Sequence, residues 1–149
     1  MNTIRRKVRT NNVQDRMIFY GPSVENGFDD ELTLSDFKID PKFLGKGGQG
    51  VVLLGEYIKN GHMYAIKRIT KDFIRKKNMV ESLRLEIKIM YSLDHPNIIK
   101  LYHNFEDNDY VYLVQELAEG GQIYESQIKK YGKVSDRKAV KYIQGLVQA

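Results

Sequence analysis

The sequence predicts an α+β fold in which an antiparallel sheet comes first along the chain and helices follow. Two observations carry this prediction. Short strand-like runs bounded by turn residues occupy most of residues 37–69 and 98–116. From 83 to 90, and again beyond 122, the apolar residues recur at the 3.6-residue period of helices. Strands in one block and helices in the next are typical of a fold built in two lobes.

The composition is that of a globular protein. Of the 149 residues, 42% are hydrophobic and 29% are charged, which argues against a wholly disordered chain. No apolar run reaches the roughly 18 residues of a membrane span, and none follows the first basic residues as a secretory signal requires. The chain has no Cys, which excludes disulfides and thiolate metal sites, and its three His are scattered without ligand spacing.

The positive charge is concentrated at the amino-terminal end. The formal net charge is +5, and residues 1–10 carry +4 of it through Arg5, Arg6, Lys7 and Arg9. With +1 left for residues 11–149, we expect no nucleic-acid partner. Residues 1–35 show no sustained period and are expected to be a disordered basic and polar tail.

The first strands surround a glycine-rich turn. We expect strands at 37–44 and 51–58, joined by residues 45–50. Asn60-Gly61 then predicts a hairpin into a third strand at 63–69. Further strands are expected at 98–105 and 110–116, separated by a turn at 106–109. This gives a sheet of five antiparallel strands.

One major helix lies between the third and fourth strands. Its apolar stripe consists of Leu83, Ile87 and Met90, and Asp94-His95-Pro96-Asn97 is expected to end it. After Gly120-Gly121 we expect a helix at 122–130. A further helix is expected with Ser135 as its N-cap and an apolar face of Ala139, Ile143, Leu146 and Val147.

Lys67 and Glu86 are expected to form an ion pair. In the third strand Lys67 shares a face with Ala65 and Ile69, which is apolar. Glu86 lies on the shoulder of the apolar helical stripe, where a carboxylate is partly desolvated and needs a cation. The pair would satisfy both groups and hold the ammonium rigidly.

Gly45, Gly47 and Gly50 form a GxGxxG pattern, which by itself is also compatible with an ordinary turn. A chain without Cβ atoms can approach phosphate closely and offer it backbone amides. A dinucleotide-binding turn of the Rossmann type requires a helix afterwards, and a strand-like run follows here. A Walker loop requires Gly-Lys-Ser/Thr at its end, whereas Val51 follows Gly50. A glycine turn between antiparallel strands remains.

Taken together, these features resemble the eukaryotic protein kinase family, and most closely the Aurora-type and polo-like serine/threonine kinases. The resemblance covers about residues 36–149 and implies an ATP-binding lobe at 36–117 and the start of a helical lobe at 118–149. The matching segments occur in the family's order: Leu44-Gly45-x-Gly47-x-x-Gly50-x-Val52, Ala65-Ile66-Lys67, Glu86, His95-Pro96-Asn97-Ile98-Ile99-x-Leu101-Tyr102, Tyr112-Leu113-Val114-x-Glu116 and Gly120-Gly121.

The resemblance implies a role for each matching position. Lys67 would hold the ATP phosphates and Glu86 would orient it. The remaining positions would bind ATP through the glycine loop, the adenine pocket, the segment after the fifth strand and the entry to the ribose or substrate path: Leu44, Gly45, Lys46, Gly47, Gly48, Gln49, Gly50, Val52, Ala65, Gln115, Glu116, Ala118 and Gln122. Gln49 and Gln115 are less common choices for the family at their positions.

The family's His-Arg-Asp and Asp-Phe-Gly motifs, which supply the catalytic base and the Mg²⁺ ligands, do not occur in these residues. We therefore expect a chain cut within the domain and inactive by itself, with Mg²⁺ bound by residues beyond Ala149. The alternative is a natural short product that acts as a binding module. A protein substrate, a regulatory protein at the Glu86 helix and an intracellular location, in cytoplasm or nucleus, are further expectations from the resemblance.

Overall fold

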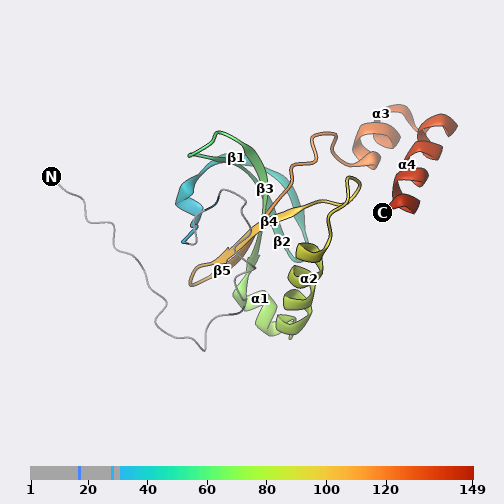
Figure 1. The fold of residues 1–149 in the computed structure, drawn as a ribbon. Coiled ribbons are helices and arrows are strands. Elements are labelled where there is room, and N and C mark those ends of the chain that lie inside the picture. Colours follow the sequence, from blue (N-terminus) through green and yellow to red (C-terminus); the bar gives the residue numbers. More distant parts are fainter. Residues whose placement is uncertain (1–16, 18–27, 29–30) are drawn as a thin grey trace.

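The computed structural model describes Met17, Phe28 and residues 31–149, and it confirms the α+β fold (Figure 1). Five strands form one open sheet in the order β1-β2-β3-β5-β4, and each is antiparallel to its neighbours. The strands are β1 (Phe37–Gly47), β2 (Gly50–Tyr57), β3 (Met63–Thr70), β4 (Leu101–Glu106) and β5 (Tyr110–Gln115).

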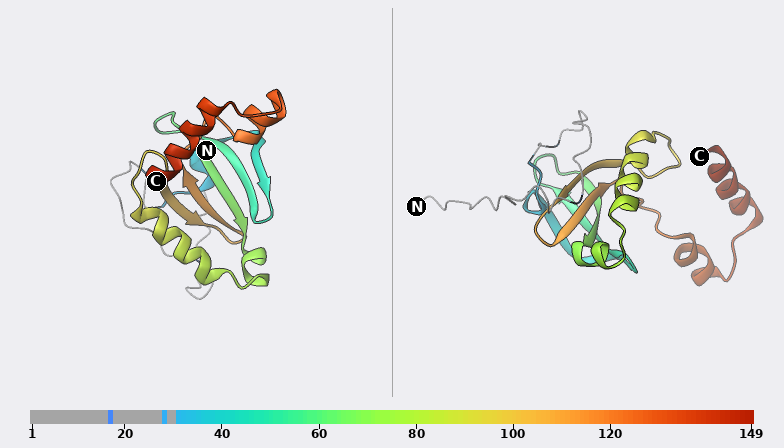
Figure 2. Two further views of the ribbon diagram at one scale, coloured as in Figure 1. Left: turned by 90° about the vertical axis from the view of Figure 1, so that its right-hand side faces the viewer. Right: turned by 90° about the horizontal axis from the view of Figure 1, so that it is seen from below.

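Two helices lie on one face of the sheet, and the carboxy-terminal helices lie beyond its end (Figures 1 and 2). α2 (Val80–Ser92) is the predicted major helix and packs against β4. The remaining helical segments are η2 (Leu34–Asp36), α1 (Lys71–Lys76), η3 (Tyr124–Ile128), α3 (Lys129–Tyr131) and α4 (Asp136–Gln148). None of the helices in the described residues is long and apolar enough to cross a membrane.

The alternation of β3 separates two hydrophobic clusters, one on each face of the sheet. Ile69 lies on the face that α1 and α2 cover, whereas Ile66 lies on the other face. The first cluster contains Met17, Ile69, Ile74, Leu83, Ile87, Leu101, Val111 and Leu113. The second contains Leu32, Phe37, Leu53, Tyr57, Tyr64, Ile66, Phe105, Tyr112 and Val114. The predicted faces of this strand are therefore confirmed.

The edge strand β1 is longer than predicted and irregular in its middle. The register of its pairing with β2 shifts between Ile39 and Phe43 and again before Gly45. Pro41 lies in this stretch, and a proline, which has no N–H to donate, is tolerated at an edge strand or a bulge. The ladder then continues as far as Gly47, which pairs with Gly50.

The six-residue helix α1 was not predicted. Thr70 is its N-cap, and the Thr70 hydroxyl accepts a hydrogen bond from the Phe73 amide at 3.2 Å. Such a cap satisfies one of the free amides at the start of a helix. Because the helix has fewer than two turns, it shows no helical period that a sequence can reveal. Thr70 followed by Asp72 was the signal that could have indicated it.

One predicted boundary was wrong, and the two predicted helices after β5 differ from expectation only in detail. β4 begins at Leu101 rather than Ile98, because the Ile98 amide donates to the His95 carbonyl in a turn. The helix expected at 122–130 is present, but residues 124–128 form a π-helical turn that leads into α3. None of these residues is buried, so no packing enforces a regular α-helix. Ser135 is the N-cap of α4, but its side chain makes no capping hydrogen bond.

Four described residues of the expected tail pack against the folded lobe: Met17, Phe28, Leu32 and Leu34. Met17 and Leu32 are buried, and Phe28 makes ring contacts with Tyr57 at 4.8 Å and Tyr64 at 5.3 Å. For these residues the prediction of a disordered tail was wrong, because their apolar side chains complete the two clusters. The four basic residues Arg5, Arg6, Lys7 and Arg9 lie outside the described part of the chain.

A buried ion pair joins α1 to the end of β4. Lys71 and Glu106 are 3% and 6% exposed, and Lys71 Nζ lies 3.4 Å from Glu106 Oε2. The Lys71 amide also donates to the Asp109 carbonyl in the β4–β5 turn. Removing one member of a buried pair leaves the other charge uncompensated, at a cost of about 3–5 kcal/mol. The pair therefore fixes α1 against the sheet.

The segment between α2 and β4 contacts the carboxy-terminal helix. The Asn97 side-chain amide donates to the Gly145 carbonyl of α4 at 3.0 Å, and the Asn97 backbone amide donates to Nδ1 of His95. The segment His95-Pro96-Asn97 follows the end of α2, as predicted. Asn97 in addition links this segment to α4, 48 residues away in the sequence.

Candidate active site

The glycine-rich segment forms the hairpin between β1 and β2, as predicted. Gly45 pairs with Val52 and Gly47 pairs with Gly50, so the tip consists of Gly48 and Gln49. A strand follows Gly50 rather than a helix, which excludes the Rossmann reading. The segment is an extended hairpin whose tip projects beyond the paired strands.

The glycines of this hairpin divide into two groups. A Cβ at Gly50 would collide with the backbone carbonyl oxygen of Arg68 on β3, so protein packing requires glycine there. A Cβ at Gly45, Gly47 or Gly48 would meet no protein atom within 4 Å. Packing does not explain these three glycines, whereas the close approach of a ligand to the backbone would.

The strand register aligns the predicted site residues across the sheet. Val52 pairs with Lys67, and Lys67 pairs with Leu113 on β5. Ala65 pairs with Gln115 two residues away on the same face. Cross-strand partners point to one side of a sheet, so Val52, Ala65, Lys67 and Gln115 share the face on which α2 lies.

The predicted pair of Lys67 and Glu86 is present. Lys67 Nζ donates to Glu86 Oε1 at 3.0 Å, and the two side chains are 21% and 40% exposed. Glu86 comes from α2 between the buried Leu83 and Ile87, which place this turn of the helix against the sheet. The pair therefore joins β3 to α2 at the edge of the apolar cluster.

Two contacts around this pair were not predicted. Gln49 at the hairpin tip and Glu86 line one small cavity together with Leu83, so the tip reaches toward α2. The Gln115 side-chain amide lies 3.8 Å from Met90 Sδ, also on α2. The spacing of Met90 from Glu86 along one helical stripe was the signal for the second contact; for Gln49 the sequence offered none.

The segment after β5 is only partly joined to these residues. The Glu116 amide donates to the Lys100 carbonyl at 2.9 Å, and the Lys100 amide donates to Glu116 Oε2 at 3.2 Å. The Ala118 carbonyl accepts from Gly121. Gln122 is exposed, and within the described part of the chain no contact joins it to Lys67 or Glu86.

Comparisons with known proteins identify the class. Residues 39–149 match the family model described as the protein kinase domain. Because this match covers most of the chain, the chain belongs to the protein kinase family. The glycine hairpin, the β3 lysine and the α2 glutamate are therefore parts of a kinase amino-terminal lobe, with α3 and α4 as the start of the helical lobe.

Individual relatives are serine/threonine kinases of more than one branch. The chain is 44% identical over 117 residues to calcium-dependent protein kinase 5 of Plasmodium falciparum, covering 78% of this chain and 20% of that protein. It is 38% identical over 122 residues to an Aurora kinase of Candida glabrata, covering 82% and 34%, and 38% identical over 117 residues to Aurora-1 of Arabidopsis thaliana, covering 78% and 39%. The predicted likeness to Aurora kinases is confirmed. The chain spans about a fifth to two fifths of these three relatives.

Proposed function

We propose that this chain is the ATP-binding part of a serine/threonine protein kinase, an enzyme that transfers the γ-phosphoryl group of Mg-ATP to protein hydroxyls. The observation that carries the proposal is the 3.0 Å pair of Lys67 and Glu86 beside the glycine hairpin. Lys67 would hold the α- and β-phosphates, and Glu86 would keep its ammonium in place.

The remaining site residues would hold the nucleotide. Free amides of the glycine hairpin would face the phosphates, and Leu44, Val52 and Ala65 would pack on the adenine ring. The Glu116 amide is engaged by Lys100, so Glu116 would accept from adenine through its carbonyl. Ala118 would donate through its amide. Gln115 would control access behind the ring, and Gln122 would lie near the ribose.

The pair of Lys67 and Glu86 acts by position rather than by stabilising the fold. Both side chains keep access to solvent, and such ion pairs typically contribute about 0.2–1 kcal/mol. A rigidly placed ammonium, in contrast, stabilises phosphate charge without reorganising when the ligand binds. Loss of Glu86 is therefore expected to affect nucleotide affinity more than stability.

Phosphoryl transfer also needs Mg²⁺ and a base. Within the described residues no group of three His, Asp or Glu side chains lies close enough together to hold a metal ion. The residues present do not fit a Mg²⁺ site, and no catalytic step is assigned to this chain. We propose that the 149 residues bind ATP but do not transfer phosphate; the domain ranges 36–117 and 118–149, the regulatory partner and the intracellular location stay predictions.

Nucleotide binding by the purified chain tests the proposal. Fluorescence titration with a labelled ATP analogue should give saturable binding, and Lys67→Met should weaken it about tenfold or more, because a charge-assisted contact is lost. Lys88→Met, an exposed lysine on α2, is the matched control and should bind like the parent. Equal affinities of all three chains would contradict the proposal.

Phosphate transfer to a generic protein substrate separates the two parts of the proposal. The parent and Lys67→Met should both remain at background. A rate well above background that disappears with Lys67→Met would show that the chain is an enzyme by itself. A chain that neither binds nucleotide nor transfers phosphate would instead favour a binding module.

A further inference from the structure

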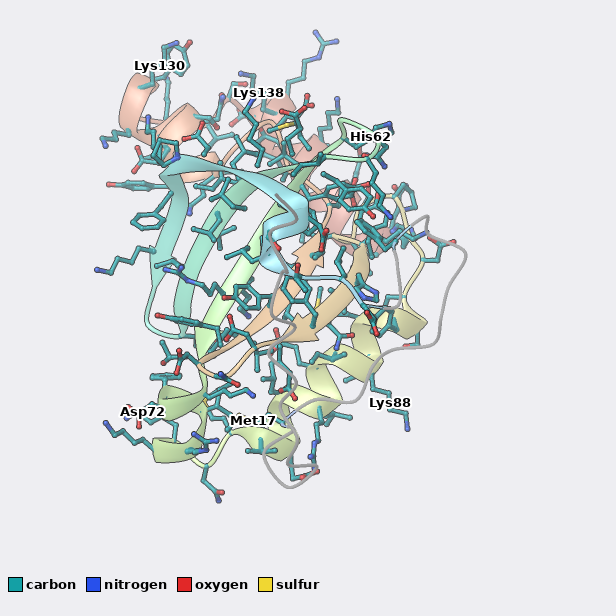
Figure 3. The ribbon with its side chains drawn as sticks, turned by 90° about the vertical axis from the view of Figure 1, so that its left-hand side faces the viewer. Met17, His62, Asp72, Lys88, Lys130 and Lys138 are labelled. Carbon is teal, nitrogen blue, oxygen red and sulfur yellow. The ribbon has the colours of Figure 1, made fainter. Side chains whose placement is uncertain are left out.

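The segment that forms α3 and the start of α4 concentrates positive charge. Six of the 13 residues from 129 to 141 are Lys or Arg and one is Asp, so this segment carries +5. Since residues 11–149 together carry +1, the rest of them carries −4. In Figure 3 Lys130 and Lys138 lie at the top of the view, and Lys88 of α2 lies at the bottom. The six basic residues, here called the basic patch, are all exposed: Lys129, Lys130, Lys133, Arg137, Lys138 and Lys141.

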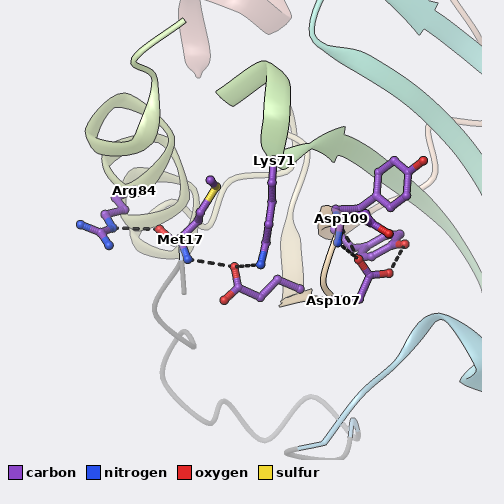
Figure 4. Close-up of polar contacts among 8 residues, drawn as sticks. Met17, Lys71, Arg84, Asp107 and Asp109 are labelled. Carbon is purple, nitrogen blue, oxygen red and sulfur yellow. Dashed lines mark hydrogen bonds and ion pairs between the residues drawn. The ribbon is translucent and has the colours of Figure 1, made fainter. Parts of the chain in front are cut away.

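Basic side chains of the sheet-containing lobe commonly have a partner within the fold. Lys71 Nζ lies 3.4 Å from Glu106 Oε2, and Arg84 Nε donates to the Met17 carbonyl at 2.9 Å (Figure 4). Arg84 Nη1 in addition lies 2.7 Å from Glu81 Oε1. Positive charge is compensated locally here, so these side chains hold elements together and attract no anion from outside.

Three side chains of the basic patch have no such partner. Among the described residues, no ion pair or side-chain hydrogen bond involves Lys133, Arg137 or Lys141. Asp136, the one carboxylate between positions 129 and 141, pairs with none of them in the described structure. The other three patch residues each have a contact: Lys129 with Glu125, Lys130 with the Tyr131 ring and Lys138 with Gln127.

Two of the unpaired residues occupy the face of α4 opposite its apolar face. Arg137 and Lys141 are four residues apart, so they are neighbours along one side of the helix. At 3.6 residues per turn, they lie on the side away from Ile143 and Leu146, which belong to the apolar face. A partner that covers the apolar face therefore leaves the basic face in water.

Local stability does not explain this arrangement. Like charges four residues apart repel each other on a helix. Arg137 and Lys138 also lie in the first turn of α4, where the helix dipole favours anions rather than cations. An anion bound to this face relieves both penalties, so the surface fits a negatively charged ligand.

The spacing of the charges favours an extended acidic peptide. Arg137 and Lys141 are separated by about 6 Å along the axis of α4, at 1.5 Å per residue. In an extended chain, side chains on one face recur at every second residue, about 6.6–6.8 Å apart. Two carboxylates at alternate positions of such a chain therefore face Arg137 and Lys141 together. A long nucleic acid fits less well, because the rest of residues 11–149 carries −4 and repels a polyanion beyond the patch.

We propose that the basic patch is a docking site for an acidic segment of a partner protein, bound in extended form with carboxylates of alternate residues against Arg137 and Lys141. Lys133, just before the helix, extends the site toward a further carboxylate. The site lies on α3 and α4, away from the pair of Lys67 and Glu86, so the inference goes beyond the proposed function and does not depend on it.

Binding of a synthetic acidic peptide to the full chain tests the proposal. A fluorescein-labelled peptide that alternates Glu and Ala should bind saturably in fluorescence anisotropy, and added salt should weaken it because the contacts are exposed. The double variant Arg137→Gln, Lys141→Gln should bind about fivefold more weakly, since one exposed ion pair contributes up to about fivefold in affinity. Lys77→Gln, Lys88→Gln removes the same charge from exposed lysines elsewhere and should bind like the parent.

A second peptide of the same composition tests the spacing. In it, pairs of Glu alternate with pairs of Ala, so that no two carboxylates lie two residues apart. It should bind the parent more weakly than the first peptide does. Equal affinities of the two peptides would overturn the proposal, and so would a double variant that binds the first peptide as tightly as the parent.

Two further measurements separate the alternatives. If a single-stranded DNA oligonucleotide of the same charge binds the parent more tightly than the peptide and loses as much affinity in the double variant, the partner is a nucleic acid and the proposal is wrong. If the double variant loses helix by circular dichroism, Lys133→Gln, which lies outside α4, decides instead and should weaken the peptide. The labelled ATP analogue should bind the double variant like the parent, so failure of the nucleotide site leaves the peptide readout unaffected.

Discussion

Tyr91, which is half-buried, fixes α2 to the sheet through one hydrogen bond to a buried side chain. Its hydroxyl donates to Oδ1 of Asn104 on β4 at 2.6 Å, and Asn104 is fully buried. Burial is the main cause that raises the pKa of Tyr91 to about 12, from an ordinary value of 10. The folded state therefore holds this proton more tightly than the unfolded chain does.

Tyr91→Phe should lower the free energy of unfolding by about 1–3 kcal/mol, because the Asn104 oxygen loses its donor in a buried place. Because the folded pKa is raised, the stabilisation by Tyr91 is fully present below about pH 10 and is lost as the pH rises through 12. The free energy of unfolding, measured with urea at a series of pH values between 10 and 12, should fall less steeply with pH for Tyr91→Phe than for the parent. Tyr131→Phe, at an exposed tyrosine, should behave like the parent.

At the scale of elements, the β1–β2 hairpin combines a structural requirement with a functional one. Position 50 requires glycine because a Cβ there would collide with the Arg68 carbonyl oxygen. At Gly48, at the tip, a Cβ would meet no protein atom within 4 Å. The same residue type thus serves two purposes within three positions. Substituting each glycine separates them.

Gly50→Ala should destabilise the chain by about 1–3 kcal/mol, because the new methyl group meets backbone that cannot move without breaking the β2–β3 ladder. Gly48→Ala should leave the melting temperature nearly unchanged but weaken the labelled ATP analogue. Thermal unfolding and titration of the two variants measure this. The prediction fails if Gly48→Ala is the more destabilising of the two.

At the scale of the whole molecule, the helical part has a face without a partner in the described structure. α4 is amphipathic, and Val140, Ile143, Leu146 and Val147 are all exposed on it. α3 and α4 lie apart from the sheet (Figure 2). Contiguous apolar surface of this kind favours association in water.

The purified chain should therefore self-associate with rising concentration, and Leu146→Glu should reduce this because it places a charge in the apolar face. Light scattering over a dilution series measures the effect. Gln148→Glu introduces the same charge away from that face and should associate like the parent. A parent chain that stays monomeric at high concentration would contradict the expectation.

Local pattern was sufficient for most of the fold and for the central part of the site. The period-two alternation of β3 and the 3.6 period of α2 placed Lys67 and Glu86 on facing surfaces, and the hairpin signals ordered the strands. Short elements escaped this reasoning. The helix α1 is too brief to show a period and depends on its cap. After β5 a helix was predicted, but its π-helical turn was not.

The sequence by itself determined the class of protein, because an ordered set of motifs along one chain specifies the amino-terminal lobe of a protein kinase. Only the tertiary structure decided which residues join α1 and the amino-terminal segment to the sheet. Met17, Lys71 and Glu106 are separated by up to 89 residues and share no period or motif, yet two buried charges and one backbone amide meet at a single carboxylate oxygen. Burial of charge requires partners from wherever the fold supplies them, and no local pattern records that requirement.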